Sequence, residues 1–287
     1  MVDAQVDLYA AAITGAVTRL GVQTQRIVAP NPSALTGPGT NTYVLGTGDA
    51  HFVIDPGPDD VAHLERVVAA ANGRVAEILC THSHPDHSPG AARLRAMTGA
   101  RVLGRPPPDD GYQDESYAPD ATLHDGAVLA LPGVTLRAVH TPGHASNHVC
   151  FLLAEQGWLF TGDHLMSGST VVILPPDGSM RQYLRSLHDL EQLPLTALLP
   201  GHGAAMPDPH AEIQRIVTHR LQREARVIDA LHAAGGTATL EAVLPVVYAD
   251  VPVSLHSLAH YSLLAHLLKL EEDGRLERRG DHWHWRQ

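Results

Sequence analysis

Cysteine, aromatic residues and basic charge are all scarce in this sequence of 287 residues. The two cysteines, Cys80 and Cys150, lie at the ends of apolar stretches, so we expect buried thiols, no disulfide framework and a cytoplasmic location. Aromatic residues make up 5% of the chain, and Lys269 is its single lysine. With 20 basic against 31 acidic residues the net charge is −11, which opposes general binding to phosphate backbones.

Long apolar runs and a basic leader are missing as well. No segment is long and apolar enough to span a bilayer. The first residues include Asp3 and Asp7 and lack an apolar core, so we expect no signal peptide. The hydrophobic share of 44% is nevertheless that of an ordinary globular protein.

Short apolar runs separated by Gly, Pro and Asp fill the chain up to residue 207. Amphipathic helical stretches interrupt them at 59–71, 88–97 and 183–192. This alternation predicts an α/β catalytic domain over residues 1–207, with ligands at loop ends. The expected strands are Thr42–Leu45, Phe52–Ile54, Val75–Cys80, Val128–Leu131, Val134–Val139, His148–Leu153, Trp158–Phe160 and Val171–Leu174.

The texture changes after residue 207. Helical patterns cover 210–233, 240–248 and about 254–272, and a short polar segment follows over 276–285. Three helices and a hairpin-like tail predict a small winged-helix domain over residues 208–287. Neither part is basic: residues 1–207 carry a net charge of −9 and residues 208–287 one of −2.

Histidine is abundant, with 20 residues, and several of them cluster with aspartate. The segment from Thr81 to His87 contains His82, His84, Asp86 and His87 directly after an expected strand. Alternate residues of an extended chain face the same way, so His82 and His84 can point at one centre. A turn at Pro85 would let Asp86 and His87 point at a second position a short distance away. Imidazole and carboxylate together suit Zn²⁺ and its neighbours in the first transition row.

Three more expected strands are each followed by a histidine or an aspartate, the residue types that bind metal ions. These residues are His144, Asp163 and His202, and each has a small residue beside it that lets the backbone approach a crowded centre. A lone histidine after a strand is usually a loop residue, and a lone aspartate in Thr-Gly-Asp is usually a turn residue. All four pieces together, each after a strand, predict a metal site.

This pattern resembles the metallo-β-lactamase superfamily, from about residue 25 to residue 207. The resemblance implies an αβ/βα sandwich with a dinuclear site of two divalent ions, Zn²⁺ in the first place and Fe or Mn as alternatives. The implied ligands are His82, His84 and His144 for one ion, and Asp86, His87 and His202 for the other, with Asp163 bridging both. The presence of both Asp86 and Asp163 is similar to glyoxalase II-like members, whereas true β-lactamases lack the bridging carboxylate.

Other segments resemble the group that includes β-lactamase-like protein 2, whose members carry a C-terminal winged helix. These segments are 41–44, 167–170, 175–178 and 199–203. For positions around the site, the sequence leaves alternatives open. Asp55 is either a support for a ligating histidine or an ordinary turn residue, and His140 and His148 are expected to be structural. His164, Tyr183 and the loop 167–170 are candidates for the substrate side.

The expected activity is that of a metal-dependent hydrolase, in which a metal-bridged hydroxide attacks an ester or thioester carbonyl. Asp86 and Asp163 are the expected catalytic carboxylates, with Asp86 accepting a proton. An acyl-CoA or glutathione thioester fits the acidic surface, although no Lys/Arg cluster for the CoA phosphates is present. The first alternative is a single-stranded-RNA endoribonuclease, opposed by the scarcity of basic and aromatic residues.

A second alternative is a metal-sensing DNA-binding protein that reads DNA with the helix Ser254–Glu272. That helix has one lysine and no arginine, and its many leucines indicate packing. We therefore expect the winged-helix domain to cover the active site or to form a homodimer contact, and we expect no membrane partner.

Overall fold

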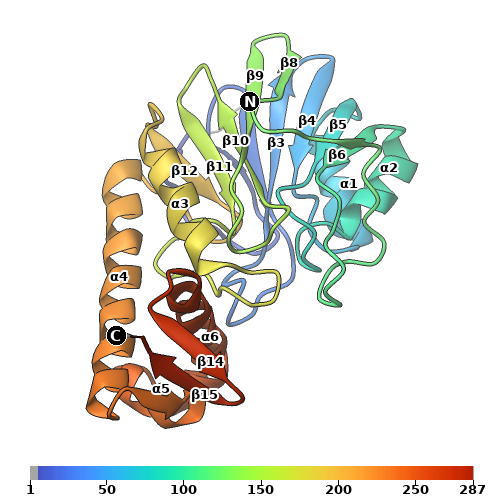
Figure 1. Ribbon diagram of the computed structural model, residues 1–287. Helices are drawn as coiled ribbons and strands as arrows, with labels where there is room; N and C mark the ends of the chain where they lie inside the picture. Colours follow the sequence, from blue (N-terminus) through green and yellow to red (C-terminus); the bar gives the residue numbers. More distant parts are fainter. Residues whose placement is uncertain (1–5, 287) are drawn as a thin grey trace. The chain divides into compact units, whose positions relative to one another are not determined.

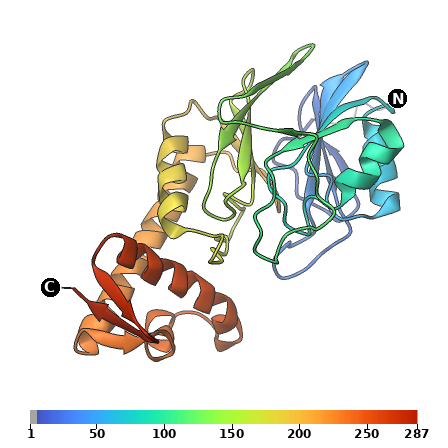
Figure 2. The ribbon, with the colours of Figure 1, turned by 45° about the vertical axis from the view of Figure 1, so that its right-hand side comes forward.

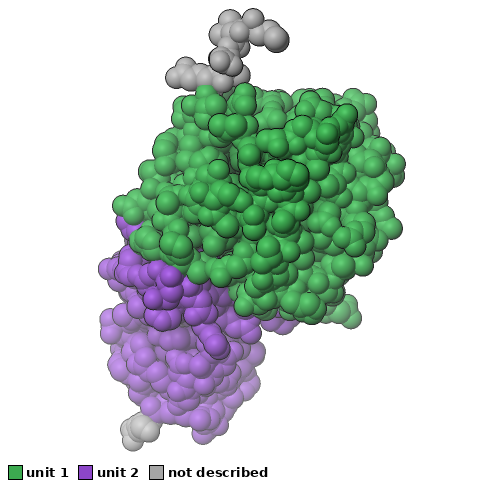
Figure 3. Space-filling view, turned by 90° about the horizontal axis from the view of Figure 1, so that it is seen from above, with its two compact units in different colours: residues 1–141, 147–171, 193–210 green, residues 142–146, 172–192, 211–287 purple. Residues whose placement is uncertain are grey.

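The computed structural model describes residues 6–286, and these form two compact units (Figure 3). Within the described residues, the first unit comprises 6–141, Asn147–Val171 and Leu193–His210, and the second comprises Pro142–Ser146, Val172–Gln192 and 211–286. The second unit therefore takes in two short segments that precede residue 207. The domain boundary at 207 stays a prediction.

A seven-stranded sheet forms one layer of the first unit, with its strands in the order β1 to β7. Its first four strands pair antiparallel, and β4 to β7 pair parallel. The strands are β1 Val17–Arg19, β2 Thr24–Val28, β3 Asn41–Thr47, β4 Ala50–Ile54, β5 Val75–Leu79, β6 Arg101–Gly104 and β7 Ala121–Thr122. Because parallel strands need crossovers, β4 and β5 are joined by helix α1 (Val61–Ala70), and β5 and β6 by α2 (Gly90–Thr98).

A five-stranded sheet forms the second layer, in the order β12-β11-β10-β9-β8. Its strands are β8 Val128–Leu131, β9 Val134–His140, β10 Val149–Leu153, β11 Trp158–Gly162 and β12 Ala197–Pro200. All pairs are antiparallel except β11 with β12, which is parallel. In Figure 1 and Figure 2, α1 and α2 lie on the side of the first sheet that faces away from the second sheet.

Two apolar cores hold these layers together. Residues of both sheets, among them Phe52, Leu136, Phe151 and Phe160, form one buried cluster between the sheets. The other face of the first sheet packs against α1 and α2, whose buried residues include Leu64, Val67, Ala91 and Leu94. Strand β4 contributes to both cores. Its residues 51–54 are all buried, because one face of the strand packs against the second sheet and the other against the helices.

The second unit contains helix α3 and the C-terminal elements. Helices α4, α5 and α6 pack with a three-stranded sheet, β13-β15-β14, around one core that includes Leu231, Val247, Leu263 and Trp283. The elements are α3 Met180–Glu191, α4 Pro209–Ala233, β13 Thr237–Thr239, α5 Leu240–Val247, the 3₁₀ turn η1 Val253–Leu255, α6 His256–Glu272, β14 Leu276–Arg279 and β15 His282–Trp285. Among residues 6–286, no helix has both the length and the apolar character needed to cross a membrane.

One predicted strand is wrong. Residues 171–174 form no strand, although Val171 and Ile173 are buried as an alternating pattern requires. Backbone carbonyls of this stretch instead accept hydrogen bonds from His144 and Gly178. The sequence did not predict the strands β1, β2, β6, β7 and β13, because their short or polar sequences carry little periodicity.

Candidate metal centre

Four strands, β5, β9, β11 and β12, end just before the residues predicted as metal ligands. The ligands follow within residues 80–87, 141–144, 163 and 201–202. In the first of these segments, the amide of His87 donates to the carbonyl of His84 at 3.0 Å. This turn places Asp86 and His87 directly after the segment that carries His82 and His84.

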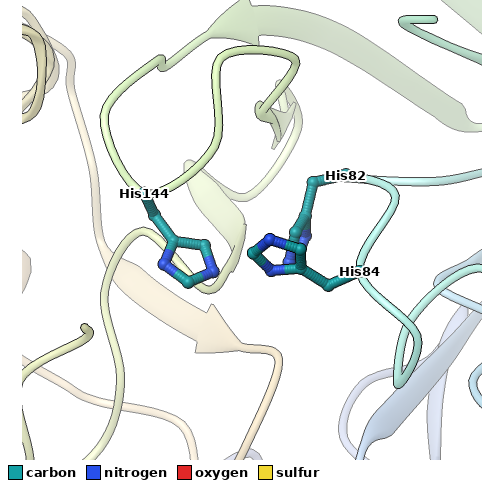
Figure 4. A group of neighbouring side chains, drawn as sticks. All are labelled: His82, His84 and His144. Carbon is teal, nitrogen blue, oxygen red and sulfur yellow. The ribbon is translucent and has the colours of Figure 1, made fainter. Parts of the chain in front are cut away.

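The first group consists of His82, His84 and His144. One ligand atom from each lies within 4.8 Å of the others, and Figure 4 shows the three rings turned toward one another. The ring centroids of His82 and His84 are 4.6 Å apart. His144 Nδ1 lies 2.8 Å from the carbonyl oxygen of Val172. Because a carbonyl only accepts, Nδ1 carries the hydrogen and the ring's lone pair lies on Nε2, as a metal ligand requires.

The second group consists of Asp86, His87, Asp163 and His202, whose ligand atoms also lie within 4.8 Å of one another. Asp163 Oδ1 is 3.3 Å from the Nε2 atoms of both His87 and His202. Asp86 Oδ2 is 3.2 Å from Nε2 of His202 and 3.6 Å from that of His87. Two imidazole nitrogens and two carboxylate oxygens therefore face one another. Asp163 belongs to this second group, and its bridging of two ions stays a prediction.

The charges of the second group perturb one another strongly. Burial alone would lower the pKa of His87, but the carboxylates of Asp86, Asp163 and Asp55 outweigh it and hold this pKa well above its ordinary value. Burial would also lower the pKa of His202, but the carboxylates of Asp163 and Asp86 outweigh this effect and raise the pKa to about 9. Burial would raise the pKa of Asp163, yet the rings of His202 and His87 hold it well below its usual range. Burial likewise opposes, but the rings of His87 and His202 lower, the pKa of Asp86, so Asp86 and Asp163 are both ionised near neutral pH.

Asp55 supports the second group from behind. Its buried carboxylate accepts hydrogen bonds from the amide of Thr81 at 2.7 Å, from the Thr81 hydroxyl at 2.8 Å and from His87 Nδ1 at 3.0 Å. Because Nδ1 of His87 donates to Asp55, Nε2 is the ring nitrogen that faces Asp163, and it would bind a metal ion after losing its proton. Of the two interpretations of Asp55, this contact favours the support for a ligating histidine.

The loop that carries His202 is held by strand β3. Asn41 Nδ2 donates to the carbonyl of Pro200 at 2.9 Å, and the Tyr43 hydroxyl donates to the same carbonyl at 2.7 Å. His202 Nδ1 lies 3.3 Å from the carbonyl oxygen of Gly39. The sequence alone predicts no role at the site for these side chains or for Thr81. Their only signal was the resemblance of segment 41–44, which carried no function with it.

Glycine at position 201 leaves room at the second group. A Cβ atom there would lie 2.7 Å from Asp163 Oδ1 and 2.7 Å from His87 Cε1. Both distances are shorter than van der Waals contact, so any larger residue would displace these two side chains. The prediction that small residues let the backbone approach the centre thus has a specific geometric basis at this position.

The remaining candidate residues lie outside both groups. His148 is buried, with its ring centroid 5.1 Å from that of His82. His164 and Tyr183 are fully buried, so neither presents a side chain to solvent. The backbone amide of His140 donates to the carboxylate oxygen Oδ1 of Asp125 at 2.8 Å.

The donor chemistry of both groups fits divalent metal ions. Imidazole nitrogens and ionised carboxylate oxygens are the ligands that Zn²⁺ and related ions take in proteins. In the second group two mostly buried carboxylates, Asp86 and Asp163, converge on one point, and a divalent cation offsets the cost of burying them.

Comparison with known proteins identifies the family. The model of the metallo-beta-lactamase superfamily matches residues 35–202. The chain belongs to this superfamily. A second model, the beta-lactamase associated winged helix domain, matches residues 239–285, so the predicted fold class, a metallo-β-lactamase fold followed by a C-terminal winged helix, is confirmed.

Relatives of this superfamily cover nearly the whole chain. A beta-lactamase-like protein 2 homolog of Drosophila melanogaster is 34% identical over 92% of this chain and 93% of its own length. An atrochrysone carboxyl ACP thioesterase of Aspergillus chevalieri is 33% identical over 90% of this chain and 83% of its own. A solved beta-lactamase domain protein from Burkholderia ambifaria shares the fold, with a TM-score of 0.79 and 20% identity over 99% of this chain and 96% of that one.

These findings settle the class of activity. The chain is a metal-dependent hydrolase of the metallo-β-lactamase superfamily, and it carries candidate His/Asp groups for divalent metal ions.

Proposed function

We propose that the protein is a dinuclear metallohydrolase that cleaves thioesters. The observation that carries the proposal is the convergence of Asp86, His87, Asp163 and His202, with ligand atoms within 4.8 Å of one another. In this proposal His82, His84 and His144 hold one ion, Asp86, His87 and His202 hold the other, and Asp163 bridges them. Zn²⁺ is the proposed metal, with Fe and Mn as alternatives.

The two carboxylates have different tasks in this proposal. When bound, two divalent ions would supply a Lewis acid for the scissile carbonyl and lower the pKa of the attacking water toward neutrality. The Asp86 side chain is 31% exposed and the Asp163 side chain 12%. We therefore assign to Asp86, the more accessible group, the proton released during attack, and to Asp163 a purely ligating role. Asp55 keeps the His87 ring in place throughout.

Two observations support a thioester as the substrate. A relative that is 33% identical over 90% of this chain is named as a thioesterase acting on an acyl carrier protein. The net charge of −11 disfavours an RNA substrate more than a small thioester. A thiolate is also a good leaving group, so the site needs no strong general acid. Acyl-CoA and glutathione thioesters are the proposed small-molecule class.

The winged-helix unit offers little support for reading DNA. Lys269, the one lysine of α6, lies 2.8 Å from Glu224 and 2.7 Å from Asp273, so its charge is already paired. Seven residues of α6, including Leu263, Leu267 and Leu270, are buried. A helix engaged in this way has few donors for base edges.

Measurements of metal content and of substrate turnover test the proposal. The panel comprises an acyl-CoA, a glutathione thioester, a lactone, bis-p-nitrophenyl phosphate and a short single-stranded RNA. We expect two metal equivalents per chain and turnover of the thioesters above that of the phosphodiesters. RNA cleavage without thioesterase activity would instead support the endoribonuclease.

Variants of the ligand residues test the site itself. Asp163→Ala is expected to lose metal together with all activity, because a carboxylate between two imidazoles is removed. His124→Ala is the matched control, since His124 is exposed and lies outside both groups. Full metal occupancy in the double variant His84→Ala, Asp163→Ala would refute the assigned ligands.

A cytoplasmic location is part of the same proposal. Cys80 and Cys150 are both buried and free, as in proteins of reducing compartments. A homodimer is likewise proposed, and size-exclusion chromatography with light scattering measures it directly.

A further inference from the structure

The turn that carries His144 is built into the second compact unit. Its residues, Pro142–Ser146, cluster with 172–192 and with the winged-helix elements. Gly143 and Ala145 on either side of His144 are buried, whereas His144 itself is half-buried. The position of this imidazole therefore depends on what holds the turn within that unit.

Two side chains clamp the turn, one at each end. The Ser186 hydroxyl, on helix α3, donates to the carbonyl of Pro142 at 2.8 Å. At the other end the amide of Ser146 donates to Asp177 Oδ2 at 2.8 Å. Ser186 is 4% exposed, so its hydrogen bond is shielded from water. Asp177 lies in the Pro-Pro-Asp-Gly segment to which the sequence assigned no role.

The start of helix α3 fits closely against the middle of the turn. The amide of Ser179 donates to the carbonyl of Gly143 at 2.8 Å. A Cβ atom at Gly143 would lie 2.4 Å from Cα of Tyr183, and Gly143 has a φ of 147°. Glycine is therefore required here on both grounds, because no side chain fits and few residues adopt that backbone.

Helix α3 is in turn anchored to the winged-helix elements. Arg181 on α3 lies 2.6 Å from a carboxylate oxygen of Glu272 and 2.7 Å from one of Asp273. The guanidinium of Arg220 on α4 lies 5.4 Å from the ring centroid of the buried Tyr183. The clamp on the His144 turn thus rests on a helix with several supports rather than on a mobile loop.

We infer that Asp177 and Ser186 are positioning residues that fix the His144 imidazole for metal binding, and that the winged-helix unit provides their support. This inference rests on the proposed function. The carbonyl oxygen of Val172 sets the tautomer of the His144 ring, because it lies 2.8 Å from Nδ1. Asp177, five residues further along the chain, accepts a hydrogen bond from the amide of Ser146, which follows His144 in the turn. Loss of either clamp lets the ring rotate, while the second group keeps its own ligands.

Metal-affinity titrations of the full chain test this inference. In competition with a chelator, Asp177→Ala and Ser186→Ala are each expected to weaken one of the two metal equivalents by about 10- to 100-fold, as is usual for residues that orient a ligand. The other equivalent keeps its affinity. Co²⁺-substituted protein is expected to show an altered visible spectrum for the weakened site only. Asp177→Asn, which retains a carbonyl oxygen as acceptor, is expected to restore most of the affinity.

Exposed residues of the same types are the controls. Asp189→Ala on α3 and Ser257→Ala on α6 remove side chains at exposed positions, and both equivalents are expected to bind as in the unmodified chain. Equal weakening of both equivalents, or none, in Asp177→Ala and Ser186→Ala would overturn the inference alone. An unmodified chain that bound no metal would overturn the proposed function as well, so the two failures are distinguishable.

Discussion

Replacing Asp55 with asparagine should prevent His87 from binding a metal ion, although Asp55 is not itself a proposed ligand. One carboxylate oxygen of Asp55 accepts from the Thr81 amide, and the other accepts from the Thr81 hydroxyl and from His87 Nδ1. Asparagine supplies one acceptor oxygen and one NH₂ donor. The NH₂ cannot face the Thr81 amide, because a backbone N–H is always a donor. It must therefore face the His87 side.

In the neutral form that binds a metal ion, His87 can accommodate that donor only by changing its tautomer. Nδ1 must then accept from the introduced NH₂ group, and the ring hydrogen moves to Nε2. That atom lies 3.3 Å from Asp163 Oδ1 in the proposed ligand group, and once protonated it has no lone pair for a metal. Losses of 10- to 100-fold in metal affinity are typical for such supporting residues, which corresponds to about 1.4–2.7 kcal/mol at the second group.

Competition titration with a chelator, followed by thioester turnover at saturating metal, measures the effect. Asp60→Asn is the matched control, since Asp60 caps helix α1 through the amide of His63 and asparagine caps a helix equally well. We expect one weakened metal equivalent in Asp55→Asn and none in the control. Two equivalents bound by Asp55→Asn with unchanged affinity would refute the tautomer argument.

Three further predictions follow from packing and burial. Gly201→Ala should reduce metal binding, measured by metal content, because its Cβ would lie 2.7 Å from Asp163 Oδ1. Leu263→Ala in the winged-helix core should cost about 2–5 kcal/mol in urea unfolding, whereas Leu255→Ala, 44% exposed, should cost far less. Burial lowers the pKa of His63 to about 4, so the folded chain holds this ring neutral while the unfolded chain protonates it near pH 6.5. This difference in pKa contributes about 3 kcal/mol to the free energy of unfolding above pH 6.5, and the contribution is lost as the pH falls toward 4. His63→Gln should therefore reduce the dependence of stability on pH in this range, as measured by acid unfolding.

The proposed ligands could be predicted because their signal is local. Metal chemistry restricts the residue types to histidine and aspartate, and an adjacent strand predicts where the side chains emerge. His82, His84, Asp86 and His87 carry this information within one short segment. His144 and His202 carry less, and became predictable only when all the strand ends were considered together.

The prediction was wrong where the conformation of a segment is set by contacts with distant parts of the chain. Residues 171–174 alternate in burial as a strand would, yet the carbonyl of Val172 serves His144 and that of Leu174 serves Gly178. Periodicity reports which side chains are buried, and it does not report where the backbone hydrogen bonds go. The same limit applies to helix α3, whose place in the second unit follows from contacts with α6 far along the chain.

Supporting residues are harder to predict than ligands for a chemical reason. A carbonyl such as that of Pro200 can be held by any donor, and here an amide and a phenol, Asn41 and Tyr43, both serve, from a strand early in the chain. No residue type or spacing marks such a contact, so only the fold reveals it. Gly201 is a different case: the sequence predicted that small residues beside the ligands let the backbone approach the centre, and the fold adds that the space beside Asp163 admits glycine alone at this position.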